Sequence, residues 1–122
     1  MARILVIDDE VTSRIILRTI LEDAGHHVIE AEDGKEGIRA YKEESIEIVI
    51  TDILMPEKDG LEIISELCQG EIDVKIIAIS SGGRFAPSNY LRSATLCGAI
   101  CTFEKPVDRD ELIGAIADLT IS

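Results

Sequence analysis

The sequence predicts an α/β domain in which a doubly wound, parallel sheet of five strands is covered by five helices. Three observations lead to this fold class. Short apolar runs rich in β-branched residues recur along the chain, segments with helical periodicity lie between them, and several of the apolar runs are unbroken. Strands that alternate with helices need crossover connections, so the sheet should be parallel, with helices on both faces.

The strands are identified by their apolar, β-branched composition. They are expected at residues 4–7, 28–31, 46–51, 74–79 and 99–103. The first run is unbroken, and the third and fourth contain unbroken apolar stretches at residues 48–50 and 76–79, which is what a sheet covered on both faces requires.

The helices are identified by apolar residues three or four positions apart. The first helix is expected at residues 12–24, with Gly25 at its end, and Gly98 should end the fourth. The stripe of the first helix consists of Ile16, Ile20 and Ala24, with Leu17 and Leu21 beside it. The third helix has the stripe Leu61, Ile64, Leu67 and Cys68, and the last has Leu112, Ala115, Ile116 and Leu119. Asp108 and Glu111 have the spacing of a capping box and should start the last helix.

Length and charge limit what the chain can do. A chain of 122 residues, 46% of them hydrophobic, can fill one core but not two, so residues 1–122 are expected to form a single domain. The formal net charge of −12 repels phosphate backbones and anionic lipid headgroups. We therefore expect no direct binding to nucleic acid or membranes, and a preference for divalent cations and basic partners.

The N-terminal segment and the cysteines both favour a cytoplasmic location. The apolar run at residues 4–7 is too short for a signal-peptide core or a membrane span. Cys68, Cys97 and Cys101 are odd in number and lack the paired spacing of a zinc site. They are expected to be buried free thiols in a reducing compartment.

Polar residues follow four of the predicted strands. They are Asp8 and Asp9 after the first strand, Asp52 after the third, Ser80 and Ser81 after the fourth, and Lys105 after the fifth. Each alone has an ordinary explanation as a helix cap, a turn residue or a surface charge. Open sheets of this kind, however, place their sites beyond the carboxyl ends of the strands. The convergence of these residues on one edge of the sheet therefore predicts a functional site.

The chemistry of this edge suits a metal ion and phosphoryl transfer. Carboxylates that lie close together must take up protons or bind a cation, and Mg²⁺ prefers oxygen ligands. An ion that keeps several waters leaves room for a phosphoryl oxygen. Asp52 could be the nucleophile, because a carboxylate can form an aspartyl phosphate. Lys105 would supply positive charge to one phosphoryl oxygen, and Ser80 a hydrogen bond to another.

Four segments of the chain together resemble the response-regulator receiver domains of two-component signalling. They are VIDDE at the first strand, TDILMPEKDG around Asp52, AISS at the end of the fourth strand and FEKPVD after the fifth. They occur in the order and spacing of that family, and the resemblance covers essentially the whole chain. It implies a flavodoxin-like sheet with the strand order 2-1-3-4-5.

The resemblance also implies a role for each matching residue. Asp52 would be the phosphoacceptor. The Mg²⁺ ligands would be Asp9, Asp52 and the backbone carbonyl of Leu54, and Asp8 would be a second acid that acts largely through water. Lys105 matches the lysine that contacts the phosphoryl group in this family.

The switch residues match the family only in part. Ser80 matches its switch hydroxyl, and Ser81 is small enough to leave room for an approaching donor or water. Many members carry an aromatic ring or His three residues before the lysine, whereas this chain has Thr102 there. Phe103 should point to the opposite face of the strand, so it cannot replace that ring. The signal is therefore expected to pass through Ser80 and the loop at residues 82–87.

The function expected from these residues is that of a phosphorylation-activated signalling module. A histidine kinase or histidine phosphotransfer protein would phosphorylate Asp52 with Mg²⁺, and this would switch a face that binds a downstream target protein or an attached output domain. The domain would catalyse only its own phosphorylation and dephosphorylation, so it would not be an enzyme. Ile15 and Ile16 are adjacent, and one of them could contact a partner, although burial is the usual fate of each.

Two other functions stay open. A pseudo-receiver would be a binding module independent of phosphorylation, but such a module does not need Asp8, Asp9, Asp52, Ser80 and Lys105 together. A small Mg²⁺-dependent phosphohydrolase would use the same carboxylates, but it would need a substrate pocket that the short loops of this chain do not supply.

Overall fold

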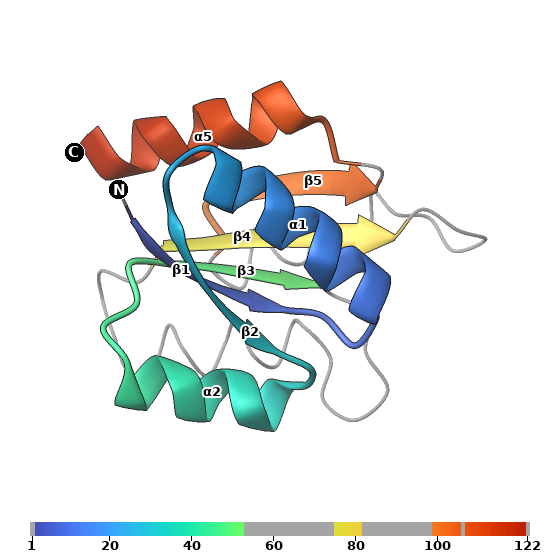
Figure 1. Cartoon of the computed structure of the whole chain (residues 1–122), viewed down its shortest axis with the longest axis vertical. Helices are drawn as coiled ribbons and strands as arrows, with labels where there is room; N and C mark the ends of the chain where they lie inside the picture. Colours follow the sequence, from blue (N-terminus) through green and yellow to red (C-terminus); the bar gives the residue numbers. More distant parts are fainter. Residues whose placement is uncertain (1, 53–74, 82–98, 106, 122) are drawn as a thin grey trace.

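The computed structural model describes residues 2–52, 75–81, 99–105 and 107–121 (Figure 1). In chain order the elements are β1 (Arg3–Ile7), α1 (Val11–Asp23), β2 (His27–Ala31), α2 (Gly34–Glu43), β3 (Ile48–Asp52), β4 (Lys75–Ser81), β5 (Cys101–Lys105) and α5 (Arg109–Ile121). The segments expected to form the third and fourth helices, with Gly98, lie outside the described residues.

The sheet has the predicted architecture. Its five strands pair in the order β2-β1-β3-β4-β5, and all four pairings are parallel. The winding reverses between β1 and β3, so the carboxyl ends of these two strands lie side by side at the edge where a site was expected.

Helices cover both faces of the sheet (Figure 1). On one face, Leu5, Ile7 and Val49 form a buried cluster with Ile38 of α2. On the other face, alternate strand residues pack with α1 and α5. The residues of that second cluster include Ile4, Val6, Ile48, Ile50, Leu17, Leu21, Leu112 and Ile116. Because β1 and β3 bury side chains on both faces, each contains an unbroken apolar stretch, at residues 4–7 and 48–50.

Three strands extend further than the apolar pattern predicts. β3 includes Asp52, β4 runs through Ser81, and β5 starts at Cys101 and runs through Lys105. Backbone pairing explains the difference, because Asp52 pairs with Ile79 and Ser81 pairs with Lys105. A strand ends where its hydrogen-bonded ladder ends, and this point need not coincide with the last apolar side chain.

The buried face of α1 differs from the predicted stripe. Leu17, Ile20 and Leu21 are buried, as expected, but Ile16 is 53% exposed and Ala24 is also exposed. Consecutive residues on a helix point about 100° apart, so the side of the helix that packs with Leu17 turns Ile16 away from the sheet. The helix ends as predicted before Gly25, which has a φ of 93°.

The start of α5 confirms the predicted cap. Oδ1 of Asp108 accepts a hydrogen bond from the backbone N–H of Glu111 at 3.0 Å. At the other end of α5, the ammonium of Lys75 donates to the backbone carbonyl of Leu119. This contact satisfies a carbonyl of the last helical turn and ties α5 to the start of β4. Within the described ranges, no helix has the length and apolar character needed to cross a membrane.

Candidate functional site

The carboxyl ends of β1, β3 and β5 bring Asp8, Asp52 and Lys105 together. Asp8 directly follows β1, and Asp52 and Lys105 are the last residues of β3 and β5. The residue two positions before each of them packs in the cluster beneath α1 and α5. Since side chains alternate between the faces of a strand, all three polar side chains are directed to that same face. Lys105 reaches across the end of β4, which lies between β3 and β5.

Asp8 is buried, and its surroundings fix its orientation. Its side chain is 2% exposed. Oδ1 accepts a hydrogen bond from the backbone N–H of Glu10 at 2.9 Å, and Oδ2 accepts one from Nζ of Lys105 at 2.8 Å. The backbone carbonyl of Asp8 accepts a hydrogen bond from the guanidinium of Arg14 at 2.7 Å. The carboxylate is therefore held by the N-cap residue of α1 and by the last residue of β5.

Asp52 is the second buried carboxylate, also with 2% of its side chain exposed. Its Oδ2 accepts a hydrogen bond from Nζ of Lys105 at 3.1 Å. One ammonium thus bridges two carboxylates that come from different strands. A pair of buried carboxylates without a cation would repel each other, so Lys105 supplies the compensating charge.

Lys105 itself is partly buried, and the neighbouring carboxylates of Asp8 and Asp52 affect the pKa of its ammonium. Burial acts to lower the pKa of its ammonium, but the hydrogen bond to Asp8 and the negative charges of Asp52 and Asp8 outweigh this effect. The pKa of Lys105 is therefore raised above its ordinary value. The side chain is a positive point charge at neutral pH.

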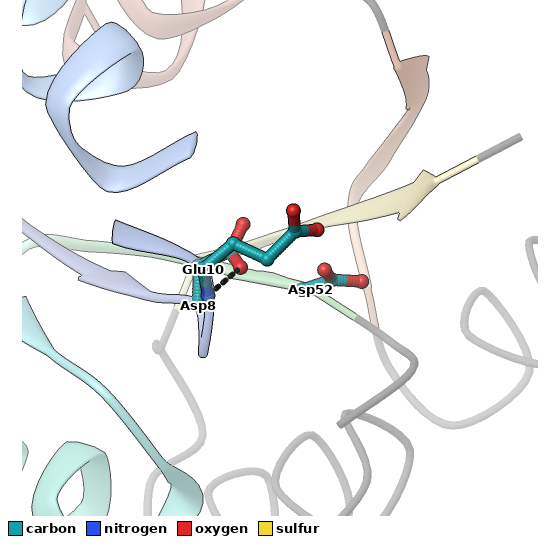
Figure 2. A group of neighbouring side chains, drawn as sticks. All are labelled: Asp8, Glu10 and Asp52. Carbon is teal, nitrogen blue, oxygen red and sulfur yellow. Dashed lines mark hydrogen bonds between the residues drawn. The ribbon is translucent and has the colours of Figure 1, made fainter. Parts of the chain in front are cut away.

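The carboxylates at this corner are suited to a hard cation. Asp8, Glu10 and Asp52 each offer an oxygen atom, and these atoms lie within 4.8 Å of one another. Figure 2 shows their three side chains gathered beyond the ends of β1 and β3. Oxygen donors with this charge fit Mg²⁺, which takes one or two carboxylates and keeps several waters. The same corner holds Lys105, whose Nζ lies 3.9 Å from Oε1 of Glu10.

The other residues of the predicted site are not brought into the cluster of Asp8, Asp52 and Lys105 or lie partly outside the described residues. Asp9 has an exposed side chain and is not one of the three clustered acids. Nor does it cap α1, because the N-cap is Glu10 and makes no side-chain cap bond. Leu54 lies outside the described residues. Ser80 and Ser81 are described only by their backbone, which pairs with Glu104 and Lys105. The roles assigned to these residues stay predictions.

The position expected to differ from the family is Thr102. Phe103 packs with Cys101 against the cluster beneath α1 and α5. Thr102 lies between them in β5, so its side chain points to the opposite face of the sheet. Phe103 is therefore on the other face from position 102, as the sequence predicts. Cys101, the one predicted thiol within the described residues, is free and only partly buried.

Two residues near the site were not identified from the sequence. Glu10, the third acid of the run after β1, takes part in the cluster in place of Asp9. Ser13, in the first turn of α1, accepts a hydrogen bond from Nζ of Lys105 at 3.0 Å. A hydroxyl in the first turn of the helix that follows the acidic run is the only local signal that could have indicated Ser13.

A second group of acids has a structural explanation. Glu32, Asp33 and Glu36 lie together at the start of α2. Oδ1 of Asp33 accepts a hydrogen bond from the N–H of Glu36 at 2.9 Å, and Oε2 of Glu36 accepts one from the N–H of Glu32 at 3.3 Å. These bonds cap the helix, so the group forms its N-terminus.

Comparison with known proteins agrees with this geometry. The family model described as a response regulator receiver domain matches residues 4–117. The chemotaxis protein CheY of Bacillus subtilis is 35% identical over 115 residues, which are 93% of this chain and 93% of that protein. The transcriptional regulatory protein GlrR of Escherichia coli strain K12 is 32% identical over 117 residues, which are 96% of this chain and 26% of GlrR.

Solved structures show the same architecture. A response regulator receiver domain protein from Clostridium thermocellum has a TM-score of 0.89 and 33% identity, with 98% of this chain and 94% of that chain covered. The response regulator protein TrrA from Thermotoga maritima, in complex with Mg²⁺-BeF, has a TM-score of 0.83 and 30% identity, with 98% of this chain and 99% of that chain covered.

Proposed function

Because the chain belongs to the response regulator receiver family of two-component signalling, we propose that Asp52 is its phosphoacceptor. The observation that carries this proposal is the bridge from Lys105 to two buried carboxylates, Asp8 and Asp52, at the carboxyl edge of the sheet. The phosphoryl group would come from a phosphohistidine on a histidine kinase or a histidine phosphotransfer protein.

The reaction is a displacement at phosphorus. A carboxylate oxygen of Asp52 attacks the phosphorus atom, the bond from phosphorus to the imidazole nitrogen breaks, and its electron pair stays on that nitrogen. The product is an acyl phosphate on Asp52, which water later hydrolyses. Lys105, already within hydrogen-bond distance of Asp52, would donate to an oxygen of the transferred group.

The clustered acids would hold the metal ion. Asp9, Asp52 and the carbonyl of Leu54 are the proposed direct ligands of Mg²⁺, with Asp8 acting largely through water. Bound there, Mg²⁺ would offset the negative charge of the carboxylates and of the phosphoryl group. Support comes from the oxygen-rich corner and from TrrA, a 30% identical structure that holds Mg²⁺-BeF. The position of Glu10 in the corner makes its carboxylate a further candidate for a contact through water.

The switch would act through Ser80. Its hydroxyl would move to hydrogen-bond the phosphoryl group, and Ser81 beside it would leave room for the donor or for water. Thr102 carries no ring that could turn inward, so the change would reach the partner-binding face through the segment that follows β4. A downstream target protein or an attached output domain would bind the changed face. The relative GlrR is long enough to carry further domains, because the match covers only 26% of it.

Donor docking would use the exposed apolar residues of α1. Val11, Ile15 and Ile16 are 58%, 55% and 53% exposed, and they lie on the helix that begins beside the acidic corner. Exposed apolar residues close to a reactive site are typical of a contact surface. The module would work in the cytoplasm and would catalyse only its own phosphorylation and dephosphorylation.

Labelling by a small phosphodonor tests the proposal. The chain is incubated with acetyl phosphate and Mg²⁺, and its intact mass is measured. We expect the mass of one added phosphoryl group, which is absent in Asp52→Asn and after chelation of Mg²⁺. Asp118→Asn, the same change on the exposed face of α5, is the matched control and should be labelled normally. An unlabelled wild-type chain would favour the pseudo-receiver, and turnover of phosphate esters would favour the phosphohydrolase.

A further inference from the structure

The ammonium of Lys105 has three acceptors around it, and one of them comes from α1. Nζ lies 2.8 Å from Oδ2 of Asp8, 3.0 Å from Oγ of Ser13 and 3.1 Å from Oδ2 of Asp52. A lysine ammonium has three N–H donors and no acceptor. These contacts can therefore engage all three donors at once, which fixes the position of the nitrogen in three directions.

Ser13 differs from the other two acceptors in charge. Asp8 and Asp52 are carboxylates that a metal ion or a phosphoryl group would also engage, whereas the Ser13 hydroxyl is neutral and does not compete for a cation. When Asp52 carries a phosphoryl group, one N–H of Lys105 would turn to it, and Ser13 would still hold another. Its hydroxyl is thus an anchor that does not depend on the state of the carboxylates.

Anchoring matters because a lysine side chain is long and flexible. Fixing its rotamers costs conformational entropy, and this cost is met in advance when the ammonium is already held in the folded domain. A charge that is placed before the reaction needs no reorganisation as negative charge develops on the phosphoryl oxygens. Ser13 is half-buried at the start of α1, and only 18% of the Lys105 side chain is exposed.

From this geometry we infer that Ser13 is a positioning residue of the phosphorylation site, which acts by holding the Lys105 ammonium beside Asp52. The inference rests on the proposed function of Asp52. It assigns a task to the first turn of α1, the helix that also carries the proposed donor-docking residues. Ser13 itself is not proposed to touch the phosphoryl group.

Two measurements on Ser13→Ala test this inference. The first is the rate of phosphorylation by acetyl phosphate with Mg²⁺, which should fall about three- to tenfold, the size of effect expected from one lost hydrogen bond. The second is the ¹⁵Nζ chemical shift of Lys105 in the Mg²⁺-free protein, read through its side-chain carbon correlations. It should change in Ser13→Ala, while the Nζ shift of Lys75, which contacts the end of α5, should stay constant.

Two further variants separate positioning from packing. Ser13→Thr keeps the hydroxyl and should restore both the rate and the Lys105 signal. Thr12→Ala removes a hydroxyl from the exposed neighbouring position and should change neither. Equal rates and equal Lys105 signals in the wild type and Ser13→Ala would overturn the inference, as would a Ser13→Thr chain no better than Ser13→Ala. An unlabelled wild type would instead overturn the proposed function, and the Lys105 signal would still test the contact itself.

Discussion

Nζ of Lys105 lies 3.1 Å from Oδ2 of Asp52, although the two residues end β5 and β3 with β4 between them. The Lys105 side chain crosses the end of β4 to reach this carboxylate, and its ammonium contacts Asp8 as well. Among the residues that the structure describes, Lys105 is thus a cation that contacts both buried carboxylates.

Replacing Lys105 by Met should lower the stability of the domain and change its response to Mg²⁺. We expect the Mg²⁺-free variant to lose about 1 to 3 kcal/mol of unfolding free energy, because two buried carboxylates lose a charged partner. Added Mg²⁺ should then raise the Tm more than in the wild type, since no ammonium competes for Asp8 and Asp52. Thermal unfolding with and without Mg²⁺ measures both effects. Lys35→Met, at an exposed site on α2, is the control, and an identical Mg²⁺ response in all three chains would contradict the account.

Gly37 of α2 is required by its contact with the sheet. A Cβ at this position would lie 2.4 Å from Cδ1 and 2.8 Å from Cγ1 of the buried Ile7. Gly37→Ala should therefore destabilise the domain by about 1 to 3 kcal/mol through overpacking. Gly114→Ala in α5 is the matched change, because nothing lies within 4 Å of its Cβ. It should stabilise by about 0.5 to 1 kcal/mol, since Ala favours the helix. Urea unfolding measures the free energy of unfolding of both variants, which should fall in Gly37→Ala and rise in Gly114→Ala.

The ion pairs of Glu30 give the stability a defined pH dependence. Hydrogen bonds from Arg18 and then Arg14 lower the pKa of Glu30, although burial acts in the opposite direction. The folded state thus favours the carboxylate. The contribution of these ion pairs to the free energy of unfolding is fully present above the pKa of the carboxyl in the unfolded state. It is lost as the pH falls through the lower pKa of the folded state.

Glu30→Gln should accordingly cost about 0.5 to 1 kcal/mol at neutral pH, the usual value of a partly exposed pair. The difference from the wild type should shrink as the solution is acidified to about pH 3, below the ordinary carboxyl pKa. Chemical unfolding at the two pH values measures it, with the exposed Glu43→Gln as the control. A difference that grew on acidification would contradict the assignment.

The sequence predicted the parts of the fold that depend on local patterns. Neighbouring residues determine the alternation of strands and helices, the cap at Asp108 and the end of α1 before Gly25. The order of the strands is not, and it came from the resemblance to a family. The burial of Ile16 was predicted wrongly, because three adjacent apolar residues on α1 leave open which side of the helix meets the sheet.

The candidate site shows the same division. Asp8, Asp52 and Lys105 could be predicted, because strand ends in a parallel sheet meet at one edge. The contact between Ser13 and Lys105 could not, since these residues are far apart in sequence. They meet because the Lys105 side chain reaches across the end of β4 to the corner beside the first turn of α1. Such a contact depends on the tertiary path of the helix, and no periodic pattern encodes it.

Ile15 should matter for transfer from a protein donor but not from a small one. It is 55% exposed on α1, the helix that begins at the site. Ile15→Ser should slow phosphorylation by a phosphohistidine-bearing partner and leave labelling by acetyl phosphate unchanged. Ile100→Ser is the matched control, because Ile100 is 51% exposed but precedes β5 at the opposite end of the sheet. Equal slowing by both variants would argue against docking on α1.

Reductive trapping directly tests whether Asp52 carries the phosphoryl group. Borohydride converts an aspartyl phosphate to homoserine, which peptide mass spectrometry assigns to one position. After incubation with acetyl phosphate and Mg²⁺, we expect homoserine at position 52 in the wild type and none in a chain treated without donor. Homoserine at Asp8 or Asp9, or an unmodified peptide from a chain whose intact mass shows the label, would contradict it.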